Sequence, residues 1–208
     1  MNIITKKVRL LSAPFVGTRI RIKLDDPESL TWGISYLALA DGCENALIDW
    51  GDGSRTVLAE SREAVHDYQA IGEYEVRISD NIKSLRCSNA SSSVFQSVYT
   101  PLINRFVTNA NTLTALGKDC LHGATNLIGF NCEGSELGTI AANSFADCSS
   151  LFGRVDLPTV VALAGNAFIN CPGITELHFS EANEAAISAL SGYATKFGAE
   201  NATISFDL

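Results

Sequence analysis

The chain has 208 residues, of which 46% are hydrophobic and only 18% are charged, so charged side chains are scarce for a soluble protein. The 15 Lys and Arg residues against 23 Asp and Glu residues give a formal net charge of −8. Nucleic-acid binding needs a basic stripe that replaces phosphate counterions, and anionic membrane surfaces also attract basic segments. The charge balance therefore argues against both as partners.

No targeting or membrane-spanning segment is expected. The first seven residues, Met-Asn-Ile-Ile-Thr-Lys-Lys, contain no apolar run of the kind found in a signal peptide. The longest apolar-rich stretches, residues 34–40 and 160–164, are much shorter than the roughly 20 residues that a bilayer-spanning helix needs. We expect a chain with no visible signal peptide and no membrane insertion.

Residues 1 to about 90 have the pattern of short β-strands between turns. Alternation of polar and apolar residues is typical of a half-buried strand, and continuous short apolar runs indicate a buried one. In residues 73–78, alternation places Tyr74, Val76 and Ile78 on one face. A small antiparallel β-sandwich is predicted, with strands at residues 19–24, 32–40, 46–50 and 73–78.

Three short motifs in this region resemble those of a PKD-type immunoglobulin-like domain. They are Asp-Trp-Gly-Asp-Gly-Ser at residues 49–54, His-Asp-Tyr at 66–68 and Gly-Glu-Tyr-Glu-Val at 72–76. The resemblance covers roughly residues 18–88 and implies an immunoglobulin-like sandwich. It also implies that His66 is structural.

The acidic residues Asp49, Asp52 and Asp67 leave three interpretations open: turn capping, a calcium site or an acid/base pair. Their spacing lacks the Asp-x-Asp-x-Asp-Gly run of a calcium-binding loop. Asp side chains commonly accept hydrogen bonds from turn amides. We expect turn capping.

From about residue 110 the sequence repeats itself. Leu121, Phe145 and Phe168 occupy equivalent positions, with steps of 24 and 23 residues between them. A period in the twenties predicts a solenoid, in which each coil buries apolar residues against its neighbours. A degenerate earlier coil is predicted within residues 94–109, with Phe106 in its strand.

The copies resemble the BspA-type leucine-rich repeat, whose pattern is Ile-Gly-x-x-Ala-Phe-x-x-Cys-x-x-Leu followed by a short strand. The second and third copies, from residues 140 and 163, fit closely. The first copy has Ala124 at the cysteine position and Leu121 at the phenylalanine position. The resemblance implies that the Phe and Cys side chains pack inside the coils.

The end of the chain, residues 181–208, is predicted to form a helix-strand cap over the last coil. Ser180 is a candidate N-cap, and Gly192 or Gly198 a candidate stop. A last strand is expected at residues 203–208. The helix, at residues 181–193, would present an apolar stripe made of Ile187, Leu190, Ala194 and Phe197.

The cysteines could be buried thiols, disulfide partners or metal ligands. No pair has Cys-x-x-Cys spacing, which disfavours a metal site. Cys148 and Cys171 lie one coil apart and Cys43 and Cys87 share the sandwich region, so either pair could approach disulfide distance. We expect mainly buried free thiols, no metal and no cofactor.

The face that carries the repeat strands is the predicted binding site. Asn131, Asp156 and His178 alternate with inward-facing residues and are therefore expected to face solvent in a ladder, about 4.8 Å from coil to coil. Glu133, Arg154 and Glu176 flank them. Such a surface could bind protein or glycan, or could equally be a solvated face without a partner.

The sequence as a whole predicts a mainly β fold with some α, in two domains: a β-sandwich over residues 1–90 and a capped solenoid over 91–208. No hydrolase, nucleotide-binding or metalloprotease motif is present, so no enzyme activity and no catalytic residue are expected. The two resemblances imply extracellular or cell-surface recognition, and a monomer is expected. The alternative is a structural part encoded by a phage or mobile element, such as a tail or fibre component. An accessory module of a carbohydrate-active enzyme is a third hypothesis.

Overall fold

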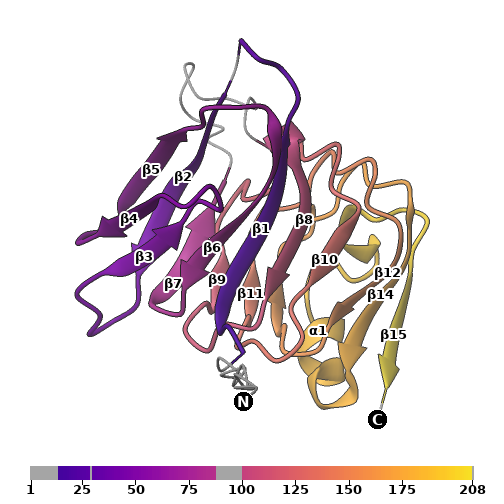
Figure 1. Ribbon diagram of the computed structural model, residues 1–208. Coiled ribbons are helices and arrows are strands. Elements are labelled where there is room, and N and C mark those ends of the chain that lie inside the picture. Colours follow the sequence, from indigo (N-terminus) through magenta and orange to yellow (C-terminus); the bar gives the residue numbers. More distant parts are fainter. Residues whose placement is uncertain (1–13, 29, 88–99, 208) are drawn as a thin grey trace, which may run out of the picture.

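The computed structural model describes residues 14–28, 30–87 and 100–207. This part of the chain is mainly β, with three sheets and one short α-helix (Figure 1). Two sheets have six strands each and the third has three.

The first sheet has the order β10-β8-β1-β6-β3-β4 and the second the order β13-β11-β9-β7-β2-β5. The third sheet has the order β12-β14-β15. The first sheet comprises β1 (Gly17–Leu24), β3 (Ala46–Asp49), β4 (Arg55–Leu58), β6 (Gly72–Ser79), β8 (Ile103–Thr108) and β10 (Gly129–Asn131). The second comprises β2 (Thr31–Leu39), β5 (Arg62–Asp67), β7 (Ile82–Arg86), β9 (Ala115–Leu116), β11 (Thr139–Ile140) and β13 (Ala162–Leu163). The third comprises β12 (Gly153–Leu157), β14 (Ile174–Ser180) and β15 (Thr203–Asp207).

The four strands predicted in the first 90 residues are all present, because alternation places one side of each against a core. In β1, Ile20 and Ile22 are fully buried while Arg21 between them is exposed. In β6, Val76 and Ile78 are fully buried and lie on the face predicted for them.

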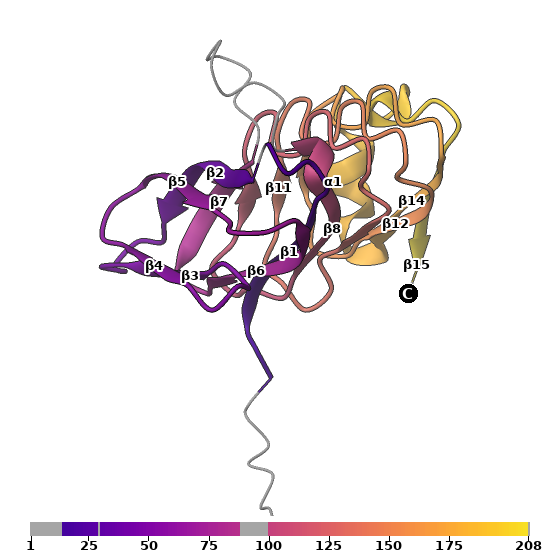
Figure 2. The ribbon, with the colours of Figure 1, turned by 45° about the horizontal axis from the view of Figure 1, so that its top comes forward.

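The sheets lie face to face over one connected hydrophobic core (Figure 2). Trp32 from β2 and Trp50 from the turn after β3 meet across it, with ring centroids 6.4 Å apart in an edge-to-face arrangement. Both rings are fully buried. Large aromatic side chains contribute much of the burial energy of a protein core.

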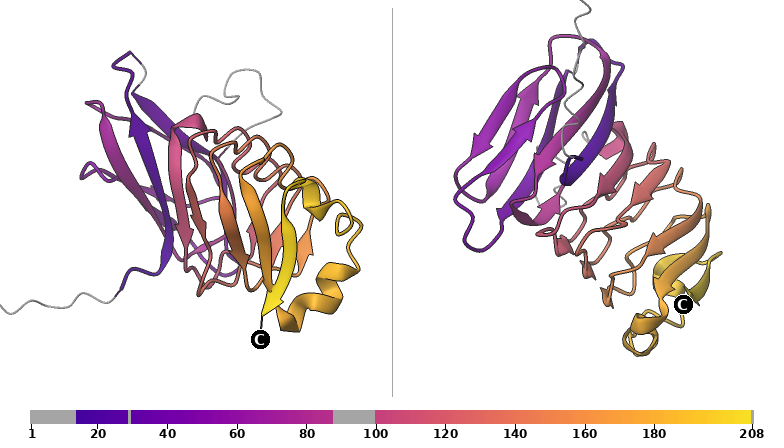
Figure 3. Two further views of the ribbon diagram at one scale, coloured as in Figure 1. Left: turned by 90° about the vertical axis from the view of Figure 1, so that its right-hand side faces the viewer. Right: turned by 60° about the horizontal axis from the view of Figure 1, so that its bottom comes forward.

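Both large sheets continue from the first region into the coils (Figure 3). Strand β8 pairs antiparallel with β1 on one side and parallel with β10 on the other. In the second sheet, β7 pairs parallel with β9 and β9 with β11. The two predicted regions therefore share their sheets. The predicted boundary at residue 90, and residues 94–99 of the predicted early coil, lie outside the described residues.

The predicted repeat register is confirmed by the stacking of the coils. Phe145 and Phe168 are fully buried and stack with centroids 4.8 Å apart. Leu121 and Ala124, which replace Phe and Cys in the first copy, are also fully buried. Phe106 lies in β8, as predicted, and stacks on Phe130 at 5.7 Å.

The predicted helix over residues 181–193 is wrong in length. Helix α1 spans only Glu184–Ser188 and is flanked by the 3-10 turns Glu181–Asn183 and Lys196–Gly198. Ser180 makes no side-chain capping hydrogen bond, and Ala194 is exposed rather than part of the apolar stripe.

The cap is nevertheless held by side chains that the stripe predicted. Ile187 and Phe197 are fully buried, and Leu190 packs partly buried against the core. Beyond the helix the chain lies close against the third coil. A Cβ atom on Gly192 would lie 2.4 Å from the Cα of Gly165.

Candidate functional site

The outer face of the first and third sheets forms one continuous strand surface, here called the strand face, from β4 to β15 (Figure 1). The two sheets join where the Cys132 thiol, just after β10, donates to the Asp156 carbonyl in β12 at 3.4 Å. In β12 and β14, Asp156 pairs in register with His178, and Arg154 with Glu176. The coil strands thus bring Asp156 beside His178 and Arg154 beside Glu176, whereas Asn131 of the predicted ladder pairs in register with Val107 of β8.

Polar side chains on this part of the strand face are linked to one another. The Arg154 guanidinium donates to Asp156 at 2.6 Å, and it lies 4.0 Å from the Glu176 carboxylate. Ser205 in β15 donates to the same Glu176 carboxylate. These contacts fix the orientation of four side chains before any ligand arrives, and such preorganisation reduces the entropic cost of binding.

The expectation that His178 faces solvent is wrong. Its residue is only 8% exposed, because it lies between β12 and β15 and its Nδ1 is 2.9 Å from the Ser205 hydroxyl. His178 therefore lies on the same side of the sheet as Glu176 and Ser205, but neighbouring side chains cover it. Asn131, Glu133 and Asp156 are exposed, as expected. Asn131 also accepts a hydrogen bond from the Glu133 amide at 2.9 Å, which closes the turn after β10.

The turn at residues 49–54 contains a second cluster of chemically active groups. Asp52 Oδ2 lies 2.7 Å from His66 Nε2, and Ser54 Oγ lies 3.1 Å from the same nitrogen. In a Ser-His-acid triad the acid and the serine bind different ring nitrogens. Because both groups meet Nε2 here, Asp52 does not orient the ring through Nδ1 while Nε2 accepts the serine proton, and the cluster has the geometry of a structural link.

The Asp52 carboxylate is the anchor of this link. Burial alone would raise its pKa, but hydrogen bonds from Ser54 and His66 outweigh that effect and lower the pKa to about 2. The His66 ring stacks on Trp50 at 5.1 Å, and the Tyr68 hydroxyl donates to the Trp50 carbonyl at 3.0 Å. Desolvation raises the pKa of Tyr68, so its hydroxyl remains a donor.

The other predicted turn carboxylates have similar local roles. Asp49 accepts a hydrogen bond from the Gly51 amide at 3.1 Å and pairs with Arg55 at 3.0 Å. Asp67 accepts a hydrogen bond from the Thr31 hydroxyl at 2.6 Å. Turn capping is thus confirmed for Asp49 and Asp52, whereas Asp67 links two strands.

All six cysteines are free thiols in the structure, so neither of the disulfides considered is formed. Burial and the nearby Asp156 carboxylate raise the pKa of Cys132 to about 12. The thiols of Cys148 and Cys171 donate to the Leu121 and Phe145 carbonyls, at 3.2 and 2.9 Å. A thiolate is the reactive form of cysteine, and the raised pKa values of Cys132 and Cys148 keep these two thiols neutral.

Two side-chain ladders that the sequence analysis missed run along the coil turns. Asn166 donates to Asn143 at 2.5 Å, and Asn143 donates to Asp119 at 2.9 Å. In the second ladder, Asn170 donates to Asp147 at 2.7 Å. The signal was present, because aligned repeat copies carry Asp or Asn at these positions and such residues tolerate left-handed backbone conformations.

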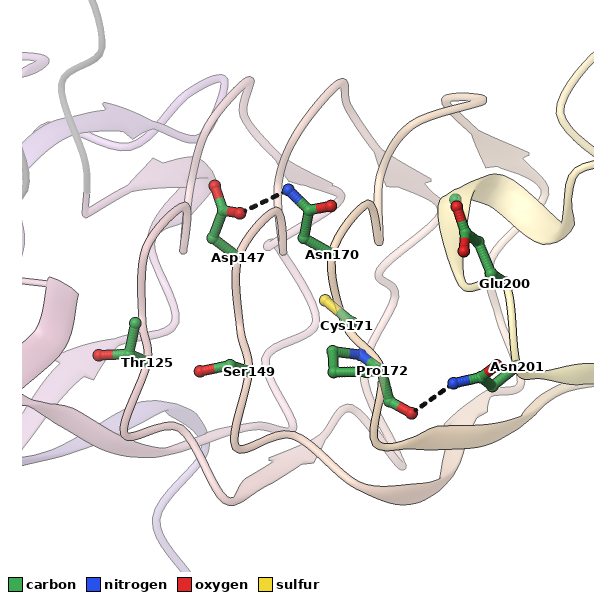
Figure 4. A pocket seen from close by; sticks show the side chains of 9 residues that line it. Thr125, Asp147, Ser149, Asn170, Cys171, Pro172, Glu200 and Asn201 are labelled. Atoms are coloured by element: carbon green, nitrogen blue, oxygen red, sulfur yellow. Dashed lines mark hydrogen bonds between the residues drawn. The ribbon is translucent and has the colours of Figure 1, made fainter.

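A lateral groove of about 500 Å³ lies between these turns and the cap (Figure 4). Thr125, Ser149 and Pro172 form one side, one residue from each coil, and Glu200 and Asn201 of the cap close the end. Asn201 is already engaged with the Pro172 carbonyl at 3.0 Å. The second row, Asp147 and Asn170, is likewise paired internally, so three of the polar side chains that line the groove already make hydrogen bonds within the chain.

Other site types find little support. Residues 14–28, 30–87 and 100–207 contain no group of three or more His, Cys, Asp or Glu side chains able to hold a metal ion. Within the same ranges, none of the helices combines the length and the apolarity needed to cross a bilayer. Comparisons with protein-family models, curated proteins and solved structures returned no match. Function is therefore inferred from the geometry of the chain itself.

Proposed function

We propose that the chain is a non-enzymatic recognition protein that binds a protein or glycan partner through the strand face. In this proposal a PKD-like sandwich, residues 1–90, continues into BspA-type leucine-rich-repeat coils, residues 91–208, that carry the binding residues. The observation that carries the proposal is the ordered network of Arg154, Asp156 and Glu176 on an exposed, continuous strand surface.

The chemistry of the strand face suits binding better than catalysis. Arginine, carboxylate, amide and hydroxyl groups offer directional hydrogen bonds to a polar ligand. Five of the six thiols are buried, and the Ser54–His66–Asp52 cluster has the wrong ring geometry for nucleophilic attack. Recognition at a cell surface or outside the cell fits such a module.

A double substitution tests the proposal. Asn131→Ala/Asp156→Ala removes two exposed polar groups of the strand face, and His178 is left intact because it is buried. The wild-type chain is first tested on a glycan microarray and on a panel of purified cell-surface proteins to find ligands. We expect the variant to fold and to bind these ligands at least about tenfold more weakly than the wild type. The matched control is Thr125→Ala/Ser149→Ala, in the lateral groove. Unchanged binding by the strand-face variant, or loss of binding by the groove variant, would show that the binding site is not on the strand face.

The alternative function, a structural part of a larger assembly, has one observation in its favour. Strand β15 is the edge of the third sheet, and an edge strand can pair with a strand of another subunit. Sedimentation over a wide range of concentrations separates the two functions. A monomer throughout supports recognition, and concentration-dependent linear oligomers support assembly.

A further inference from the structure

The strand face carries a concentration of arginines on β1, β6 and β8, although the chain as a whole has a net charge of −8. The outward positions of these three strands hold five basic and two acidic residues. They are Arg19, Arg21, Lys23, Arg77 and Arg105, against Glu73 and Glu75. This part of the strand face is therefore positive while the protein is acidic.

The pairing of the strands places like charges directly opposite one another. Arg21 in β1 is in register with Arg105 in β8, and Arg19 is in register with Arg77 in β6. Directly opposed like charges destabilise a sheet. Although the chain has few charged residues, four arginines are concentrated in these two pairs. Such a surface suits an anion that binds between the paired arginines.

Internal partners neutralise only part of this charge. The Glu75 carboxylate forms ion pairs with the guanidinium groups of both Arg21, at 3.4 Å, and Arg77, at 2.9 Å. Arg19 lies 6.0 Å from the centre of the Phe15 ring. Within the described residues, the Arg105 guanidinium has no carboxylate or hydrogen-bond partner. Its stem extends over Gly129 of β10, 3.7 Å from where a Cβ would be, so the absent side chain leaves room for it.

The arginines surround a shallow hollow of about 230 Å³. Its lining consists of Arg19, Arg21 and Arg105 with Glu75 and Val107. This volume accommodates one sulfate or carboxylate group with the atoms that bear it. A guanidinium offers paired N–H donors that match the oxygens of such a group.

We propose that this hollow binds the sulfate or carboxylate group of an acidic saccharide. The saccharide part of the inference rests on the proposed function, because the neighbouring strands β10 and β12 present Asn131 and Asp156, which can bind sugar hydroxyls. A single-stranded nucleic acid is disfavoured because it needs aromatic rings for base stacking. Phe15 is the ring beside the hollow, and two arginines, Arg19 and Arg77, lie over it.

Calorimetric titration tests the inference with two acidic tetrasaccharides, one sulfated and one made of uronic acids. The neutral control is chitotetraose. We expect both acidic sugars to bind, more weakly as salt rises, and the neutral sugar to bind at least about tenfold more weakly. Arg21→Gln/Arg105→Gln should weaken acidic-sugar binding by about tenfold or more. The matched control, Arg62→Gln/Lys118→Gln, removes two exposed charges elsewhere and should bind normally.

Several outcomes would overturn the inference. These are equal loss in the control variant, equal binding of the neutral sugar, and tighter binding of polyglutamate or a single-stranded oligonucleotide. Absence of acidic-sugar binding would also overturn it. In that case the Asn131→Ala/Asp156→Ala comparison still decides the proposed function independently. The Arg21→Gln/Arg105→Gln variant loses the exposed ion pair of Arg21 with Glu75 but also relieves the repulsion between the two arginines, so its melting temperature should stay close to that of the wild type. A melting curve measured beside the titration then shows that lost binding does not reflect misfolding.

Discussion

Single residues in the coil turns decide how closely the coils can follow one another. Asp119, Asn143, Asp147 and Asn170 all adopt positive φ angles between 56° and 60°. Their side chains form hydrogen bonds with the equivalent residue of a neighbouring coil. Asn and Asp serve both purposes, because they tolerate the left-handed conformation and offer a side-chain hydrogen bond.

Two substitutions at Asn143 separate these contributions. Asn143→Gly keeps the φ of 56° accessible but loses the bonds to Asp119 and Asn166. We expect it to lower the free energy of unfolding by about 1–2 kcal/mol. Asn143→Ala loses the same bonds and adds left-handed strain, about 1 kcal/mol more. Urea unfolding measures both. Equal stability of the two variants would contradict the role of the backbone conformation.

The Asp52 carboxylate makes stability depend on pH in a defined window. Its pKa falls from an ordinary 3.8 to about 2 in the folded protein, so the ionised form stabilises the fold above pH 3.8. That contribution is lost as the pH falls toward 2. We therefore expect Asp52→Asn to lower the melting temperature at pH 6, with the difference from wild type shrinking below pH 4. A difference that stays constant down to pH 2 would show that Asp52 keeps an ordinary pKa.

At the scale of elements, the second and third coils each place a phenylalanine at the centre of the core. Phe145 stacks on Phe168 at 4.8 Å and meets Phe130 at the same distance, edge to face. We expect Phe145→Ala to cost about 3–5 kcal/mol of unfolding free energy, because it leaves a cavity between coils. Phe152 in the same repeat is 67% exposed, so Phe152→Ala should stay within about 0.5 kcal/mol of wild type. Near-wild-type unfolding of Phe145→Ala would refute the repeat register.

The cap depends on a close backbone approach. Because a Cβ on Gly192 would lie 2.4 Å from Gly165 and 2.7 Å from the Phe197 ring, Gly192→Ala should push the cap off the last coil. We expect a cost of about 1–3 kcal/mol and faster hydrogen exchange in β15. Gly138→Ala is the control, since its nearest neighbours are 3.9 Å away. Unchanged exchange in the Gly192 variant would contradict tight seating of the cap.

At the scale of the whole molecule, local sequence patterns predict the strands and coils, but they do not predict that the sandwich region and the coils share two sheets. Alternation in residues 19–24 and the 24- and 23-residue steps of the repeat depend on neighbours in sequence, so the strands and coils could be predicted. The pairing of β1 with β8 joins residues about 90 positions apart, such as Thr18 and Thr108, and no local pattern encodes it.

The candidate site shows the same limit. The outward residues of the coil strands were predicted from alternation, but the burial of His178 depends on Ser205 in the last strand. The arginine hollow could not be predicted from the sequence, because the residues that line it come from three strands that meet only in the folded sheet. Net charge of the whole chain is a poor guide to such a surface, because a local patch can have the opposite sign.

Amide chemical-shift mapping tests recognition through the strand face most directly. In a titration of the isotope-labelled chain with the sulfated tetrasaccharide, the largest shifts should fall on β1, β8, β10 and β12. Residues near Arg21, Arg105, Asn131 and Asp156 should respond together with one affinity. Shifts confined to the lateral groove around Ser149 and Asn201, or no shifts at millimolar sugar, would contradict recognition of this ligand by the strand face.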